Sequence, residues 1–157
     1  MSTAYEYLQT PLGMMRVSAT EAGLTEAAFI ERTEFMATEQ TATGNAITSE
    51  AAKQLREYFA GERTGFDLPL AAEGTHFRQQ VWQALLGIAY GETCSYRDIA
   101  QSINNPNAVR AVGTANGANP IAVIVPCHRV IGSNGKLTGY AGGLTRKQFL
   151  LALEGAL

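Results

Sequence analysis

The spacing of apolar residues changes along this 157-residue chain, and that change limits the folds open to it. The first 30 residues alternate in the manner of strands, whereas residues after 74 recur at helical spacing. Residues 61–74 lie between these stretches and contain three glycines and one proline, as expected of a linker. The sequence therefore predicts an α/β fold of the α+β kind. Its two domains would be residues 1–73 and 74–157.

The first domain is predicted to be a β-meander followed by one helix. Strand-like runs flank two turn signals, Thr10–Gly13 and Glu21–Gly23. Ser49 is the predicted N-cap of a helix that runs to about Ala60. The polar segment at residues 31–48 has no pattern that assigns it.

The second domain is predicted to be mostly helical and to contain a helix-turn-helix. Thr75 would cap its first helix. Ser95 and Asp98 form a capping-box pattern that begins a short second helix. A third helix is predicted over Ala108–Asn116, and two short helices joined in this way are typical of a helix-turn-helix.

The remainder of this domain is predicted to hold a buried run and a final helix. Ile121–Val125 is apolar and β-branched, which indicates a short buried strand or extended segment. Pro126 ends that run and predicts an extended backbone before Cys127. Thr145 is the predicted cap of the last helix, with Gln148 completing a capping box.

Composition argues against several classes of protein. Two cysteines and two histidines occur in spacings that match no zinc site, so we expect no metal and free thiols. The longest apolar run is far too short to span a bilayer. The first residues do not resemble an export signal, so a cytoplasmic location is expected.

Charge is divided unequally between the two predicted domains. Residues 1–73 carry a net charge of −6, and residues 74–157 carry +4. Taken alone, such an asymmetry is more often ordinary solvated surface. It would also suit a polyanion that meets the second domain.

Cys127 is the residue best placed for covalent chemistry. A thiol becomes a strong nucleophile only as its thiolate, which needs a base or a positive field. His128 and Arg129 follow it directly. Adjacent residues need not touch, however, so these residues alone are equally compatible with a half-buried cysteine beside a surface histidine. Cys94 lacks such neighbours and is assigned no chemical role.

Several motifs, in order, resemble those of the O6-alkylguanine-DNA alkyltransferases. The run Pro126-Cys127-His128-Arg129, preceded by Asn119-Pro120, resembles the family's active-site signature. The similarity covers about residues 75–155, whereas the first domain fits the family's variable domain by layout alone. Four further segments resemble, in turn, the start of the helix pair, the recognition helix, the substrate loop and the final helix: Ser95-Tyr96, Ala108–Gly113, Gly139–Gly143 and Leu150–Glu154.

The resemblance implies a suicidal DNA-repair reaction that needs no cofactor. Cys127 would take the alkyl group from guanine O6 and keep it as a thioether; activity on O4-alkylthymine is left open. His128 would act as base through a bridging water, and Glu154 would hold His128. Asn119 would brace the segment before the active site, and Tyr96 would donate to guanine N3 as charge leaves the base.

The resemblance also assigns contacts to a double-stranded DNA partner containing O6-alkylguanine. The target atom lies inside a duplex, so the nucleotide must be flipped out, and Arg110 would fill the gap. We expect a monomer that requires no protein partner. The implied DNA-binding residues are Arg110, Tyr96, Ala111, Thr114, Ala115 and Gly117, and the implied substrate-binding residues are Val130, Tyr140, Ala141 and Gly142.

Three other functions would each require features that differ from those of this sequence. A non-catalytic sensor of alkylated bases would carry another residue in place of Cys127. A helix-turn-helix transcription regulator would place base-reading side chains on the second helix, where Ala, Gly and Val predominate. A cysteine hydrolase would turn over repeatedly and would not need Arg110.

Overall fold

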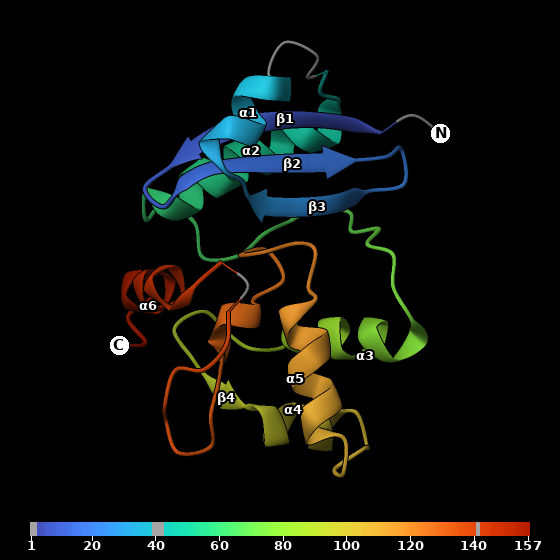
Figure 1. Ribbon diagram of the computed structural model, residues 1–157, viewed down its shortest axis with the longest axis vertical. Helices are drawn as coiled ribbons and strands as arrows, with labels where there is room; N and C mark the ends of the chain where they lie inside the picture. The colour runs from blue at the N-terminus through green and yellow to red at the C-terminus, as the bar shows by residue number, and fades with distance from the viewer. Residues whose placement is uncertain (1–2, 39–42, 141) are drawn as a thin grey trace. The chain divides into compact units, whose positions relative to one another are not determined.

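The chain folds into two compact units, seen in a computed structural model that describes residues 3–38, 43–140 and 142–157 (Figure 1). Unit 1 comprises residues 1–73 with 120–124, and unit 2 comprises residues 74–119 with 125–157. The mixture of a small sheet with helices confirms the predicted fold class. Residues 120–124, which the sequence analysis placed in the second domain, are part of unit 1. None of the helices among the described residues has the length and apolar character needed to cross a membrane.

Unit 1 is built on the predicted β-meander. Strands β1 (Ala4–Thr10), β2 (Gly13–Ala19) and β3 (Leu24–Phe29) form an antiparallel sheet in that order. The side chains of β2 alternate only in part: Met15, Val17 and Ala19 are fully buried and Arg16 is not, but Ser18 on the other face is also buried.

The outer edge of β3 is covered by two segments from later in the chain. Leu24 forms an isolated parallel bridge with Leu70, and Ala27 forms one with Ile121. The Ala27 amide donates to the Pro120 carbonyl at 2.9 Å. These bonds satisfy backbone groups that an open edge strand would expose.

The prediction of an extended backbone over Ile121–Val125 is wrong beyond Ile121. Val123 has φ of +71°, and the Ile124 amide donates to the Ala122 carbonyl at 2.8 Å, which closes a three-residue γ-turn. Such a backbone is unusual for a β-branched residue. The predicted burial is nevertheless correct, because Ile121, Val123, Ile124 and Val125 are all buried.

Two α-helices among the described residues complete unit 1. Helix α1 (Arg32–Thr38) falls in the segment that the sequence left unassigned. Helix α2 (Ala46–Phe59) begins one turn earlier than predicted, because Asn45 and not Ser49 is its N-cap. The Asn45 side chain accepts from the Thr48 amide at 2.9 Å, and the Thr48 hydroxyl accepts from the Asn45 amide at 2.8 Å. The apolar face of α2 is buried through Ala51, Ala52, Leu55 and Tyr58.

Unit 2 is mostly helical and contains the predicted helix pair. Thr75 caps α3 (His76–Leu85), and the capping box predicted at Ser95 is present at the start of α4 (Tyr96–Ser102). Helix α5 (Val109–Gly117) follows and packs against α3 and α4. The Trp82 indole on α3 donates to the Ala115 carbonyl on α5 at 2.9 Å, and Trp82 is buried in the core of unit 2.

Short elements connect this helical layer to the C-terminus. Strands β4 (Cys94–Ser95) and β5 (Val130–Ile131) pair in parallel, and the sequence did not predict them. The predicted cap of the last helix is wrong: α6 (Leu144–Leu153) begins after Gly143, and no described side chain caps it. Gly143 has φ of +93°, a conformation that favours glycine, so the backbone itself sets this start and Thr145 lies in the first turn.

We predict that Asn45→Ala lowers the free energy of unfolding of unit 1 by about 1 kcal/mol, because it removes a helix cap. Ser49→Ala is the matched control. It removes only an exposed hydrogen bond to Glu6 and should change that free energy by less than about 0.5 kcal/mol. Urea denaturation monitored by circular dichroism would measure the free energy of unfolding of both variants. Equal losses in the two variants would contradict the assignment of Asn45 as the cap.

Candidate active site

The chain turns sharply immediately before Cys127. The Cys127 amide donates to the Val125 carbonyl at 2.8 Å around Pro126, whose φ of −81° and ψ of 63° define an inverse γ-turn. The prediction of an extended backbone at Pro126 is therefore wrong. Cys127, His128 and Arg129 then form one turn of 3-10 helix, η2, and all three are buried.

His128 is paired with a carboxylate from the end of α6. Its Nε2 lies 2.8 Å from Glu154 Oε2, and both side chains are fully buried. A carboxylate can only accept, so Nε2 donates and Nδ1 of the neutral ring is left as an acceptor. Nδ1 has no hydrogen-bond partner among the described residues.

Arg129 holds the same carboxylate from the other side. Its Nε and Nη2 donate to Glu154 Oε1 and Oε2 at 2.8 and 3.0 Å, a bidentate arrangement. Nη1 donates to the Ile88 carbonyl at 2.7 Å, and the guanidinium lies over the Tyr90 ring. Arg129 follows the cysteine closely in sequence, but no sequence pattern predicted this ion pair.

Burial controls the protonation of the cysteine and the histidine. It lowers the pKa of His128 by more than the Glu154 carboxylate raises it, which favours the neutral ring. Burial also raises the pKa of Cys127, although a hydrogen bond from Asn119 and the charge of Lys147 act in the opposite direction. At rest, the Cys127 thiol and the His128 imidazole are therefore both neutral.

Two asparagines hold the segment around the cysteine. The Asn119 side chain donates to the Val125 carbonyl at 2.8 Å. The Asn116 side chain donates to the Cys127 carbonyl at 3.3 Å, and the sequence analysis missed it.

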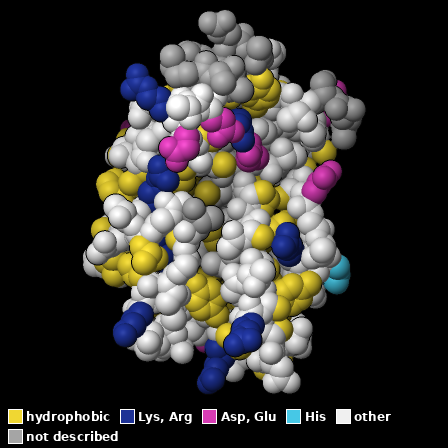
Figure 2. All heavy atoms as spheres, in the orientation of Figure 1, with side chains coloured by type: hydrophobic (Ala, Val, Ile, Leu, Met, Phe, Trp, Pro, Cys, Tyr) yellow, Lys and Arg dark blue, Asp and Glu magenta, His cyan; other side chains and the backbone are white. Residues whose placement is uncertain are grey.

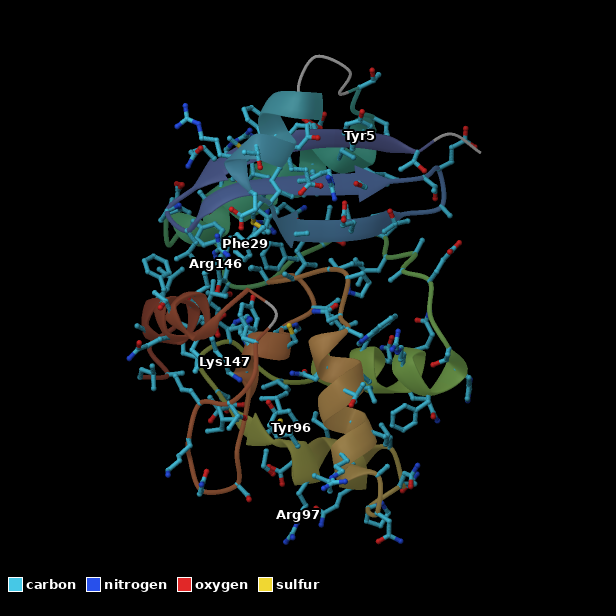
Figure 3. All side chains as sticks on the ribbon, in the orientation of Figure 1. Tyr5, Phe29, Tyr96, Arg97, Arg146 and Lys147 are labelled. Carbon is cyan, nitrogen blue, oxygen red and sulfur yellow. The ribbon has the colours of Figure 1, made fainter. Side chains whose placement is uncertain are left out.

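Lys147 is a second residue that the sequence analysis missed. It is fully buried on α6 and donates to the carbonyls of Val130 and Thr138 at 2.6 and 2.8 Å (Figure 3). No carboxylate among the described residues pairs with it. Lys147 therefore joins β5 to the loop before α6 and contributes a buried positive charge.

The predicted substrate loop is only partly described. Ala141 lies outside the described residues. The Tyr140 hydroxyl is buried without a partner among the described residues, and burial together with the charge of Cys127 raises the pKa of Tyr140. A Cβ on Gly142 would lie 2.8 Å from the Tyr140 ring, so only glycine fits there without a shift.

The residues implied for DNA contact lie on α4 and α5, with one exception. Arg110, Ala111, Thr114 and Gly117 are exposed on α5, and Figure 2 shows basic side chains over the α4–α5 part of unit 2. Ala115 is wrong as a contact residue, because it is 2% exposed against Trp82 on the inner face of the helix.

The other candidate groups do not match this arrangement. Both cysteines are free, but Cys94 is half-buried, and burial with the charge of Asp98 raises its pKa to about 11. Within the described part of the chain, no group of His, Cys, Asp or Glu side chains could hold a metal ion. A buried cysteine followed in the chain by a neutral histidine that a carboxylate orients is instead typical of a protein with a cysteine nucleophile.

Comparisons with known proteins agree with this class. Two family models match the chain: the ribonuclease-like domain of 6-O-methylguanine DNA methyltransferase over residues 3–72, and its DNA binding domain over residues 76–156. The methylated-DNA–protein-cysteine methyltransferase of Methanosarcina acetivorans is 50% identical over 153 residues, which cover 97% of this chain and 98% of the relative.

Solved structures give the same result. The O6-methylguanine methyltransferase of Mycobacterium tuberculosis has a TM-score of 0.86 and 49% identity, covering 99% of this chain and 94% of that one. A structure of Mycobacterium tuberculosis OGT in complex with DNA has the same TM-score and identity, covering 98% and 93%. This chain belongs to the 6-O-methylguanine DNA methyltransferase family.

We predict that Glu154→Gln destabilises unit 2 by about 3–5 kcal/mol, because it leaves the buried Arg129 without a counter-charge. Glu57→Gln breaks an ion pair with Arg63 that is about a third exposed, and should cost less than about 1 kcal/mol. Chemical denaturation of the two variants measures the difference. Similar small losses would mean that the Glu154 cluster does not stabilise the fold.

Proposed function

We propose that this protein repairs DNA by moving the alkyl group of O6-alkylguanine onto its own Cys127. The observation that carries the proposal is the buried pair of His128 and Glu154, which leaves His128 Nδ1 as an acceptor with no partner in the described part of the chain, one residue from the thiol. Membership of the methyltransferase family supports the choice of substrate.

The reaction moves one proton and forms one bond to sulfur. His128 Nδ1 takes the thiol proton through a bridging water, and the Glu154 carboxylate, which Arg129 holds in place, stabilises the imidazolium that results. The thiolate attacks the alkyl carbon, the carbon–O6 bond breaks, and its electron pair passes to the guanine. The thioether on Cys127 has no easy hydrolysis route, so each molecule acts once.

The guanine leaves more readily if a donor meets the negative charge that develops on its ring. Tyr96, in the first turn of α4, donates to guanine N3 in this role. Val130 and Tyr140 line the base site, together with the loop at Ala141 and Gly142. The raised pKa of Tyr140 keeps its hydroxyl protonated and able to donate.

Helix α5 provides the contact with DNA. Arg110 enters the duplex in place of the flipped nucleotide, and the small exposed residues Ala111, Thr114 and Gly117 allow the helix to approach the groove closely. Contacts to phosphates are independent of sequence, which suits a protein that must search all DNA. We propose that it acts as a monomer in the cytoplasm, without cofactor or protein partner.

Mass spectrometry provides the direct test of this function. Excess protein mixed with duplex DNA bearing O6-methylguanine should gain one methyl group, on the peptide that contains Cys127. Cys127→Ser should gain none, and the Cys94 peptide serves as an internal control. Tight binding of the lesion without transfer would instead indicate a sensor. If the protein neither bound the lesion nor accepted the methyl group, the proposed function would be excluded.

We predict that Arg110→Ala slows methyl transfer from duplex DNA by about tenfold or more, because the flipped state loses the side chain that fills the gap. Transfer from a single strand, where no gap forms, should slow much less. Arg56→Ala, an exposed substitution on α2, matches the change in charge and should alter neither rate. Single-turnover kinetics on both substrates measure the effect, and equal slowing on the two would contradict the flipping role of Arg110.

A further inference from the structure

The Tyr96 hydroxyl and Thr138 are joined by two hydrogen bonds. The Thr138 hydroxyl donates to Tyr96 Oη at 3.1 Å, and the Tyr96 hydroxyl donates to the Thr138 carbonyl at a longer 3.4 Å. Tyr96 is half-buried and Thr138 is exposed, so this contact lies at the surface of unit 2. Neither the motifs nor the family resemblance assigned a role to Thr138.

Both partners are fixed to the same part of the active site. The residue before Tyr96 pairs with Ile131 through the β4–β5 ladder. The Thr138 carbonyl is held by Lys147 Nζ, which also binds the carbonyl of Val130. Figure 3 shows Tyr96 at the start of α4 and Lys147 on α6, from which they reach the loop that carries Thr138. Thr138 is thus a fixed point beside the phenol.

We propose that Thr138 is a positioning residue for alkyl transfer, and that its hydroxyl orients and polarises the Tyr96 phenol toward the leaving guanine. The inference rests on the proposed function, which makes Tyr96 the donor to that base. Thr138 itself touches no reacting atom and acts only through Tyr96 Oη.

The directions of the hydrogen bonds support this role. A phenol oxygen that accepts a hydrogen bond becomes a stronger donor, because the negative charge that it gains on sharing its proton is stabilised. The acceptor of the phenol proton is the Thr138 carbonyl at a long 3.4 Å, and that carbonyl keeps its bond to Lys147 when the proton leaves. The hydroxyl can therefore turn to guanine N3 while its oxygen stays bound by Thr138.

A double-mutant cycle tests the proposal. Thr138→Val keeps the shape of the side chain and removes the donor, so single-turnover methyl transfer at saturating DNA should slow by about three- to tenfold. Thr138→Ser keeps the donor and should stay within about twofold of the unmodified protein. In a Tyr96→Phe background, which lacks Oη, Thr138→Val should cause no further slowing.

Each other outcome overturns the inference. Equal slowing by Thr138→Val with and without the Tyr96 hydroxyl would mean that Thr138 acts through loop structure instead. Faster transfer would mean that Thr138 restrains the phenol. Slower transfer caused only by weaker DNA affinity, measured separately by titration, would make Thr138 a DNA contact. Transfer to Cys127 by the wild-type protein is the reference for the four variants. Absence of that transfer would reject the proposed function. Transfer by the wild-type protein at the same rate as by Thr138→Val would reject this inference alone.

Discussion

The candidate site depends on the ionised carboxylate of Glu154. This group ends helix α6, where the helix dipole disfavours negative charge, and it is buried, which disfavours any charge. Arg129 offsets both effects with its bidentate pair, and His128 donates to one of the same oxygens. Because these two residues are consecutive in one turn of 3-10 helix, a single carboxylate orients the base and anchors the turn that carries Cys127.

The charges around the sulfur follow from this arrangement. Thiol and imidazole are both neutral at rest, since burial disfavours the ionised form of each. Charge separation is needed only when the proton moves, and then Glu154 faces the imidazolium while Lys147 favours the thiolate. Lys147 is itself poorly solvated, and burial lowers its pKa while the Cys127 thiolate would raise it. The site therefore stabilises the ion pair that the reaction creates and leaves the resting sulfur unreactive.

Local signals predicted the parts of this fold that short stretches of chain determine. The caps at Thr75 and Ser95, the meander and the helix pair each depend on neighbouring residues, so their patterns are visible in sequence. Asn45 and Ser49 stand one helical turn apart, so periodicity could not choose between them. An apolar run does not reveal the positive φ of Val123, and β4–β5 is too short and non-local to leave a pattern. The signal that would have found Lys147 was available: it shares one helical face with Leu150 and Leu151, and a charged side chain on a buried face needs a polar partner.

Cys127 belongs to unit 2 but follows three residues after a segment of unit 1, and the path of the chain explains this order. The backbone leaves unit 2 after Asn119, covers the edge of β3 with Pro120–Ile124, and returns at Val125. The Asn119 side chain closes this excursion by donating to the Val125 carbonyl, and it also hydrogen bonds toward Cys127 in a way that lowers the pKa of the thiol. One amide therefore fixes the point of return and favours the thiolate two residues further on. Because both bonds lie within unit 2, the position of the sulfur is set by the unit that carries its base.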